Sequence, residues 1–164
     1  MNIYTDGACK ENLRDNGVGC GSGGWAYVIL DQPSEREDME IVMMKSDSKD
    51  GTTNQEMEIT AVAEAFEALK HSDHKVRDAI VLYSDSAYVI NCLKDRWYDK
   101  WNANGWLNSK KKPVENRDAW ERLINSIKDF NVDFFHVKRN TTKYIRMVDG
   151  MAKKASKQEK TQEH

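Results

Sequence analysis

Residues 79–86, AIVLYSDS, form a compact apolar run that ends in three polar residues. A short run of large apolar side chains after a polar turn is typical of a buried parallel strand. Residues 54–71 before it carry apolar side chains at helical spacing, so we expect a helix to lead into this strand. A helix followed by a buried parallel strand indicates an α/β fold with helical crossovers. Ligands in such folds gather at the carboxyl ends of the parallel strands, where Asp85 lies.

The segments on either side of this unit extend the sheet and add further helices. Residues rich in Ile, Val, Tyr and Trp predict strands, and apolar residues at helical spacing predict helices. The predicted strands are 2–8, 25–30, 37–44 and 132–137, and the predicted helices are 87–93, 114–130 and 148–157. The connection over residues 10–24 is polar and rich in glycine, and we expect a mobile loop there.

The same connection contains GCGSGG at residues 19–24, a formal match to the dinucleotide-binding pattern. That pattern requires a strand before it and a helix directly after it. Because a strand is predicted after these glycines, an ordinary glycine-rich turn is the favoured interpretation.

The composition indicates a single domain of mixed charge. The chain has 164 residues, with 25 Lys and Arg against 27 Asp and Glu, and a formal net charge of −2. We expect one domain over residues 1–158 and a charged, disordered tail over residues 159–164. The balance of charges gives no general attraction to polyanions, so any nucleic-acid contact must be local.

The cysteines and the hydropathy pattern suggest a compartment. Cys9, Cys20 and Cys92 are scattered without metal-ligand spacing, and we interpret them as free thiols in a reducing environment. The sequence starts in a strand-like pattern, and no stretch is long enough to span a bilayer. We therefore expect a soluble, cytoplasmic protein, monomeric and without an obligate protein partner.

Three acidic residues stand where ordinary packing would not favour a charge. Asp6 and Asp85 each end a predicted strand, and Glu58 lies on the apolar stripe of the helix over residues 54–71. Carboxylates gathered against a core repel one another and lose hydration, so they persist mainly when cations lie between them. Together they predict a metal site. For Asp85 alone, capping of the next helix is the ordinary alternative.

Aromatic and basic residues gather farther along the chain. Trp97 and Trp101 have helical spacing, and Trp106 and a lysine run at residues 110–112 follow them. Aromatic rings beside cations suit a nucleic-acid backbone. A tryptophan pair spaced by four is also an ordinary packing stripe, and a lysine run is also ordinary solvated surface, so both interpretations stay open.

The order of these segments resembles the type 1 ribonuclease H family, which cuts the RNA strand of RNA/DNA hybrids. The resemblance covers nearly the whole chain, and its strongest pieces are residues 4–8 (YTDGA), 52–58 (TTNQEME), 84–89 (SDSAYV) and the tryptophan segment through 112–114 (KPV). It implies a ribonuclease H-like fold, with a five-stranded mixed sheet of three antiparallel strands and then two parallel strands, flanked by helices.

The resemblance also implies a catalytic metal site. In the family, an acid in each of the first three segments and another at the start of the last helix hold two Mg²⁺ ions, for which Mn²⁺ is a substitute. These catalytic and metal-binding residues correspond here to Asp6, Glu58, Asp85 and Asp149. For Asp149, a favourable position near a helix N-terminus is the alternative explanation. Asn140 stands where the family has a loop histidine, which predicts slower turnover or a shifted metal optimum.

The implied partner is an RNA/DNA hybrid, recognised by its shape. Contacts to the RNA 2′-hydroxyls would come from Gly7, Ala8, Cys9, Asn54 and Gln55. Contacts to the DNA strand would come from Thr53 and Trp97, with Trp101, Trp106, Lys110, Lys111 and Lys112 forming the rest of a protrusion. Hydrolysis would leave a 5′-phosphate and a 3′-hydroxyl.

Two other functions are compatible with the same residues. Another nuclease or strand-transfer enzyme with this fold would also need clustered acids and two metals. A hybrid-binding module without turnover is conceivable because Asn140 replaces the histidine. The tryptophan protrusion disfavours the first, and the intact acids Asp6, Glu58 and Asp85 disfavour the second.

Overall fold

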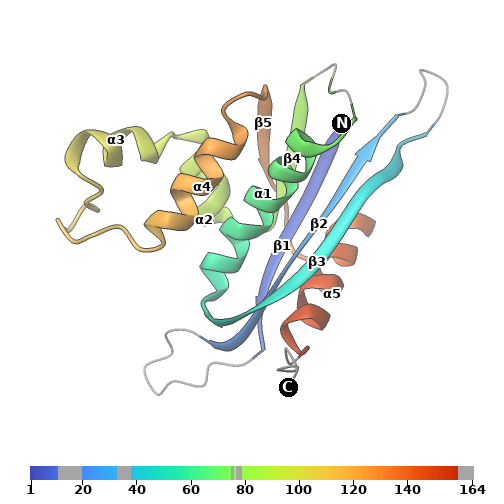
Figure 1. Ribbon diagram of the computed structural model, residues 1–164, viewed down its shortest axis with the longest axis horizontal. Coiled ribbons are helices and arrows are strands. Elements are labelled where there is room, and N and C mark those ends of the chain that lie inside the picture. Colours follow the sequence, from blue (N-terminus) through green and yellow to red (C-terminus); the bar gives the residue numbers. More distant parts are fainter. Residues whose placement is uncertain (11–19, 33–37, 75, 77–78, 159–164) are drawn as a thin grey trace.

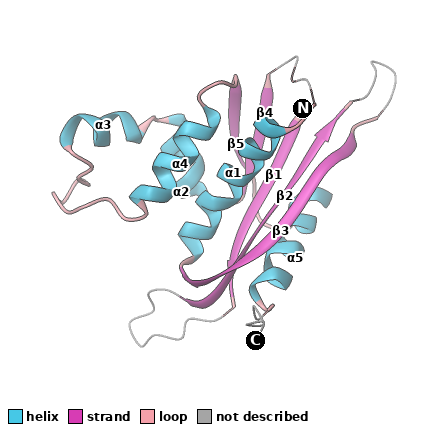
Figure 2. Cartoon of the chain, in the orientation of Figure 1, coloured by secondary structure: helices cyan, strands magenta, loops and turns pink. Residues whose placement is uncertain are grey.

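The structure is a computed structural model that describes residues 1–10, 20–32, 38–74, 76 and 79–158. Five strands and five helices are present in these residues (Figures 1 and 2). The strands are β1 (Asn2–Cys9), β2 (Cys20–Asp31), β3 (Glu40–Thr52), β4 (Ile80–Ser84) and β5 (Val132–His136). The helices are α1 (Asn54–His71), α2 (Ala87–Lys94), α3 (Trp97–Asn104), α4 (Arg117–Ile127) and α5 (Lys143–Ser156). The predicted tail at 159–164 and most of the predicted mobile loop lie outside the described residues.

The strands form one mixed sheet in the order β3-β2-β1-β4-β5. The three strands β1, β2 and β3 pair antiparallel, whereas β4 is parallel to both β1 and β5. This arrangement confirms the predicted fold class. Thr5 of β1 pairs with Ser84, the last residue of β4, so Asp6 and Asp85 lie side by side where β4 ends. Strand β1 continues to Cys9, so Asp6 lies within this strand and not at its end as expected.

Helices cover both faces of this sheet. Helix α1 packs on β1 and β2 from one side and is itself contacted by α4, and α5 packs on the same two strands from the other side (Figure 1). The larger hydrophobic cluster lies under α1 and includes Phe66, Leu82 and Trp120. The smaller cluster lies under α5 and includes Val28 and Val148. Helix α3 projects away from the sheet beyond α2 and α4 (Figure 1).

Helix α1 begins and faces the sheet as its sequence predicts. Thr53 caps it, because its side-chain oxygen accepts a hydrogen bond from the backbone N–H of Glu56 at 3.0 Å. The apolar stripe, with Val62 and Phe66 among its residues, is buried against the sheet. Glu58 lies on that stripe and is only 6% exposed, so this carboxylate is delivered into the interior as expected.

The glycines that were expected in a mobile loop lie largely in strand β2. This strand begins at Cys20, so Gly24 pairs with Ala8 of β1. A Cβ atom on Gly24 would lie 2.3 Å from the carbonyl oxygen of Ala152 in α5. The glycine is therefore needed for close packing of α5 on the sheet. Residues 20–24 of the GCGSGG motif lie within β2, which continues to Asp31, so no helix follows these glycines and a dinucleotide-binding turn is ruled out.

Besides the early start of β2, other element boundaries also differ from the sequence prediction. Strand β3 continues to Thr52 instead of ending at residue 44, because its polar second half pairs with β2 along the edge of the sheet. Helix α4 is shorter than predicted at both ends. Helix α5 starts five residues early, at Lys143, because the Thr142 side chain caps it by accepting a hydrogen bond from the N–H of Ile145.

None of the helices within the described ranges is long and apolar enough to cross a membrane.

Candidate active site

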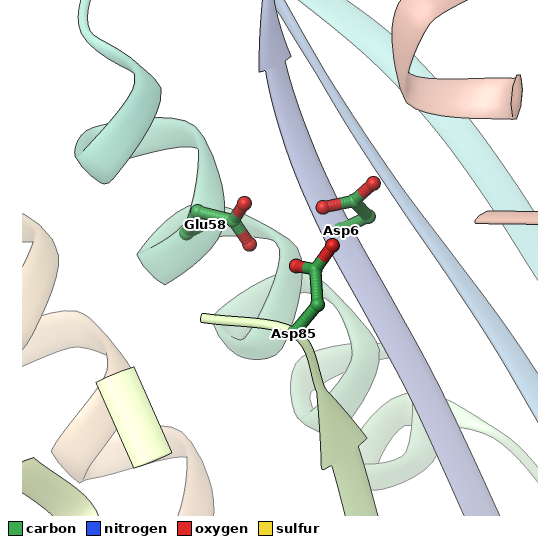
Figure 3. Close-up of side chains that lie close together, drawn as sticks. All are labelled: Asp6, Glu58 and Asp85. Carbon is green, nitrogen blue, oxygen red and sulfur yellow. The ribbon is translucent and has the colours of Figure 1, made fainter. Parts of the chain in front are cut away.

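Asp6, Glu58 and Asp85 converge on one point at the edge of the sheet (Figure 3). One carboxylate oxygen from each residue lies within 4.8 Å of the other two. Asp6 comes from β1, Glu58 from α1, and Asp85 from the residue directly after β4. The convergence predicted from three distant segments is confirmed.

The turn after β4 fixes the position of Asp85. The side chain of Ser86, not Asp85, caps α2 by accepting a hydrogen bond from the N–H of Val89 at 3.2 Å. The alternative explanation of Asp85 as the helix cap is therefore wrong. The ring Nε2 of His136 on β5 lies 3.1 Å from the carbonyl oxygen of Asp85, a contact that ties this turn to the neighbouring strand.

Gly7 lets α1 approach β1 closely enough to bring Glu58 beside Asp6. A Cβ atom at this position would lie 2.4 Å from the backbone nitrogen of Glu58 and 2.5 Å from the carbonyl carbon of Met57. Because both clashes are with helix backbone, no side-chain rotation would relieve them. The glycine next to Asp6 is thus part of the geometry of the acid cluster.

Burial and mutual repulsion make the cluster electrostatically unfavourable without cations. Burial, and then the charge of Asp85, raise the pKa of Asp6 to about 8. Burial followed by the charges of Asp6 and Asp85 raises the pKa of Glu58 well above its usual range. The Oε2 atom of Glu58 is buried and has no hydrogen-bond partner among the described residues. A buried carboxylate oxygen in this environment is a suitable ligand for a cation.

The cluster fits the ligand chemistry of a hard divalent cation. Mg²⁺ and Mn²⁺ favour carboxylate oxygens, and Mg²⁺–oxygen distances are about 2.1 Å, so oxygens on opposite sides of one ion are about 4 Å apart. The observed spread of 4.8 Å needs only a small inward movement to reach this value. The residues present therefore fit a divalent metal site.

Asp149 lies beside this cluster in a different environment. It is in the second turn of α5, because the helix starts at Lys143, so a position at the helix N-terminus does not explain it. Its two carboxylate oxygens lie 2.9 Å from Lys153 Nζ and 3.5 Å from an Arg139 guanidinium nitrogen. Although burial raises the pKa of Asp149, hydrogen bonds from Lys153 and Asp6 and the nearby positive charges hold it below its usual value.

A cavity opens over the three acids and is lined by all five residues predicted to contact RNA. Its lining includes Gly7, Ala8, Cys9, Asn54 and Gln55 together with Asp6, Glu58 and Asp85. Thr53 is adjacent as the cap of α1. Arg139 and Lys153 also line the cavity. The sequence interpretation missed these two cations, although Lys153 is four residues after Asp149 and so falls on the same helix face.

The tryptophans of the predicted protrusion divide into two kinds. Trp101 and Trp106 are 8% and 5% exposed, and both belong to the larger hydrophobic cluster. Trp97 is half-buried and lines a second cavity together with Gln55 and Lys100. The lysines of the run are exposed: Lys110, Lys111 and Lys112. Packing therefore accounts for Trp101 and Trp106, while Trp97 and the lysines are accessible to a ligand.

Other expectations about single residues need correction or gain detail. Cys92 is a buried free thiol, as predicted, but Cys9 is disulfide-bonded, so the expectation of a free thiol there is wrong. His136 is exposed, and its ring contacts the backbone of the turn after β4 that carries Asp85. Asn140 has φ of 63°, a left-handed conformation that asparagine tolerates better than most residues.

Comparison with known proteins identifies the chain. The sequence pattern of RNase H matches residues 1–157. The chain belongs to the ribonuclease H family. A ribonuclease H from Thermoanaerobacter sp. (strain X514) is 39% identical over 153 residues, which are 93% of this chain and 86% of that protein. A ribonuclease H from Prosthecochloris aestuarii (strain DSM 271 / SK 413) is 37% identical over 156 residues, 94% of each chain. The chain is thus an enzyme of a hydrolase family that acts on RNA in hybrids.

Solved structures of other ribonucleases H have the same fold. LC9-RNase H1 is described as a type 1 RNase H with the type 2 active-site motif. Its structure matches with a TM-score of 0.79 at 24% sequence identity, and the match covers 94% of this chain and 71% of LC9-RNase H1. LC11-RNase H1, solved in complex with an RNA/DNA hybrid, has a TM-score of 0.65 at 19% identity, with 94% of each chain covered. These structures share the ribonuclease H fold of this chain at low sequence identity.

Proposed function

We propose that this ribonuclease H is an endonuclease that hydrolyses the RNA strand of RNA/DNA hybrids with two divalent metal ions, leaving 5′-phosphate and 3′-hydroxyl ends. The observation that carries the proposal is the convergence of Asp6, Glu58 and Asp85 at one edge of the sheet in a ribonuclease H fold. The acids, the cavity and the protrusion all lie on one chain, so we propose that it acts as a monomer.

Two Mg²⁺ ions, or Mn²⁺ ions in their place, would be held by Asp6, Glu58 and Asp85, with Asp149 as the fourth acid. When bound, they would lower the pKa of the attacking water and neutralise the charge that develops on the leaving oxygen. The burial and mutual repulsion that raise the pKa values of Asp6 and Glu58 support this assignment, because a bound cation would offset both effects.

The chain's own residues would position the RNA strand over the acids. Backbone groups of Gly7, Ala8 and Cys9 and the side chains of Asn54 and Gln55 line the same cavity, within reach of 2′-hydroxyls in a shallow minor groove. A 2′-hydroxyl both donates and accepts hydrogen bonds, so these contacts would distinguish RNA from DNA. Arg139 and Lys153 would attract the phosphates to the cavity.

The DNA strand would be held on the side of the protrusion. Thr53 uses a lone pair of its hydroxyl oxygen to cap α1, which leaves its O–H free to donate to a phosphate oxygen. Trp97 and the lysines at residues 110–112 would follow the same backbone across the second cavity. None of these contacts reads a base edge, so selection would depend on the shape of the hybrid.

Cleavage specificity tests this proposal directly. The purified chain would be incubated in Mg²⁺ with a labelled RNA/DNA hybrid, duplex DNA, duplex RNA and branched DNA of matched length. We expect cleavage of the RNA strand of the hybrid alone, with 3′-hydroxyl products. Cleavage of branched DNA in preference to the hybrid would favour a different nuclease of the same fold.

The variant Asp85→Asn separates catalysis from binding. The substitution keeps the size of the side chain and removes its charge, so we expect loss of cleavage by at least about a hundredfold while hybrid affinity survives. Hybrid binding without any metal-dependent cleavage by the wild-type chain would instead favour the binding module. Retained cleavage in Asp85→Asn would remove this residue from the metal site.

A further inference from the structure

Three aromatic rings form a continuous stack across the sheet beside the acid cluster. Tyr4 and Tyr83 pair on adjacent strands, with ring centroids 4.8 Å apart and planes 12° apart. Tyr83 pairs in turn with Phe135 of β5, with centroids 6.0 Å apart and planes 26° apart. The ring of Tyr144 at the start of α5 contacts Tyr4 at 5.4 Å and covers that end of the stack.

The other end of the stack is open. Strand β5 is the edge of the sheet, so no further strand supplies a ring beyond Phe135. The Phe135 side chain is 48% exposed, one of three large hydrophobic side chains with such exposure in the described part of the chain. The Lys94 ammonium lies over its ring, 5.7 Å from the ring centre. The stack thus ends in a half-exposed aromatic ring with a cation over it.

Basic residues follow this open end of the stack, although the chain as a whole is slightly acidic, with a net charge of −2. Lys138 and Arg139 come two and three residues after the end of β5, and both are exposed. Residues 134–148 contain no acidic residue. The nearest acid on the strand, Asp133, lies two residues from Phe135 in the direction away from the acid cluster. The positive region therefore extends from Phe135 toward the cluster.

The stack and the acid cluster share their strands. Tyr4 precedes Asp6 by two residues, and Tyr83 precedes Asp85 by two. Because side chains two residues apart on a strand lie on the same face, each ring is next to a carboxylate. Arg139, which follows β5, lines the cavity over the acids. A chain of nucleotides leaving that cavity toward β5 would meet Arg139 and then the exposed face of Phe135.

We propose that Phe135, Lys94 and the basic residues that follow β5 form a binding surface for single-stranded RNA that extends from the hybrid. A base would stack on Phe135 as the next ring of the series, in the place of the Lys94 ammonium, and the displaced Lys94 side chain and Arg139 would contact the flanking phosphates. The proposal rests on the proposed function because the surface continues from the hybrid site. It makes hybrids with single-stranded RNA extensions the favoured substrates over blunt ones.

The test compares the affinity of one short hybrid in several forms, measured by fluorescence anisotropy in EDTA so that metal-dependent cleavage does not intervene. One hybrid is blunt. The second and third carry a single-stranded RNA extension of about six nucleotides at the 5′ end or at the 3′ end, and the fourth set carries the same extensions without bases. The proteins are wild type, Phe135→Ala, Phe135→Tyr and Lys94→Ala. Met44→Ala is the matched control, because Met44 is 51% exposed on the opposite edge strand.

We expect one of the two extensions to lower the Kd of the wild-type protein by about fivefold or more relative to the blunt hybrid. Phe135→Ala should abolish that advantage, Phe135→Tyr should keep it, and Lys94→Ala should reduce it. The advantage should also be lost with the abasic extension and unchanged in Met44→Ala. All variants should bind and cleave the blunt hybrid as the wild type does, so failure here is distinguishable from failure of the proposed function.

Three results would overturn the proposal. Equal Kd values for blunt and extended hybrids would show that the surface does not bind RNA. If the abasic extension lowered the Kd as much as the intact one, attraction between the phosphates and the basic residues would explain the binding, and no base would stack on Phe135. If an acidic peptide bearing a phenylalanine bound wild type but not Phe135→Ala, while RNA extensions had no effect, the surface would belong to a protein partner.

Discussion

Replacing Asp6 with Asn should stabilise the metal-free protein at alkaline pH while it abolishes cleavage. The pKa of Asp6 is raised from 3.8 to about 8 in the folded protein, by burial and then by the charge of Asp85. Between these two pH values the folded protein holds a proton that the unfolded chain has released. The folded state therefore binds more protons, and its stability falls as the pH rises through this window.

The size of the effect follows from the shift. About four pKa units at about 1.4 kcal/mol each set an upper limit of about 5 to 6 kcal/mol on the cost of ionising Asp6. Local rearrangement and water entry reduce such costs, and we expect about 2 kcal/mol, or about 4 to 8 °C in Tm for a chain of this size. Asparagine removes the charge without changing the shape, so the variant should recover this amount at pH 9.

Thermal unfolding in EDTA from pH 5 to pH 9 measures the difference. The Tm of wild type should fall relative to that of Asp6→Asn as the pH rises, and the variant should be the more stable protein at pH 9. Asp50→Asn, a matched change at an exposed residue of β3, should leave the Tm unchanged. Mg²⁺ should raise the Tm of wild type more than that of Asp6→Asn. A variant less stable than wild type at pH 9 would refute the electrostatic reasoning.

The remaining predictions concern the helix contact and the loop before α5. Gly7→Ala should destabilise the protein by about 3 kcal/mol in denaturant unfolding, because the new Cβ would clash with the backbone of α1 at 2.4 Å. Gly150→Ala is its control and should be neutral or stabilising by about 0.5 kcal/mol, because a Cβ there meets nothing within 4 Å; equal losses in both would contradict the packing argument. Asn140→His should raise steady-state turnover several-fold by supplying a group that exchanges protons near neutral pH. Unchanged rates in both Mg²⁺ and Mn²⁺ would argue against that role.

Local patterns in the sequence were enough to predict the sheet and three of the four acids. The apolar run before Asp85 and the helical stripe through Glu58 each depend on the burial of side chains at a fixed period. The parallel pairing of β1 with β4 then brings Asp6 and Asp85 together, as a helical crossover requires. The site is predictable to this extent because secondary structure alone fixes the direction of each carboxylate.

Features that depend on contacts between distant residues were not predictable in the same way. The pairing of Asp149 with Arg139 requires the path of the loop between β5 and α5, which no local pattern specifies. The polar second half of β3 has little strand character and is held by pairing with β2. Burial of Trp101 and Trp106 likewise depends on distant contacts, because the ring of Trp101 packs against Trp120 of α4 and the ring of Trp106 packs against Trp101.

The central claim is that three carboxylates from distant segments hold divalent cations against the scissile phosphate. The most direct test is a crystal structure of the Asp85→Asn variant and of wild type, each with Mn²⁺ and a bound RNA/DNA hybrid whose RNA linkage at the cleavage site cannot be hydrolysed, in which anomalous scattering locates the ions. We predict two Mn²⁺ sites in wild type between Asp6, Glu58 and Asp85, next to one RNA phosphate, and loss of at least one site in the variant. Ions bound elsewhere, with the three carboxylates facing only solvent, would contradict the account.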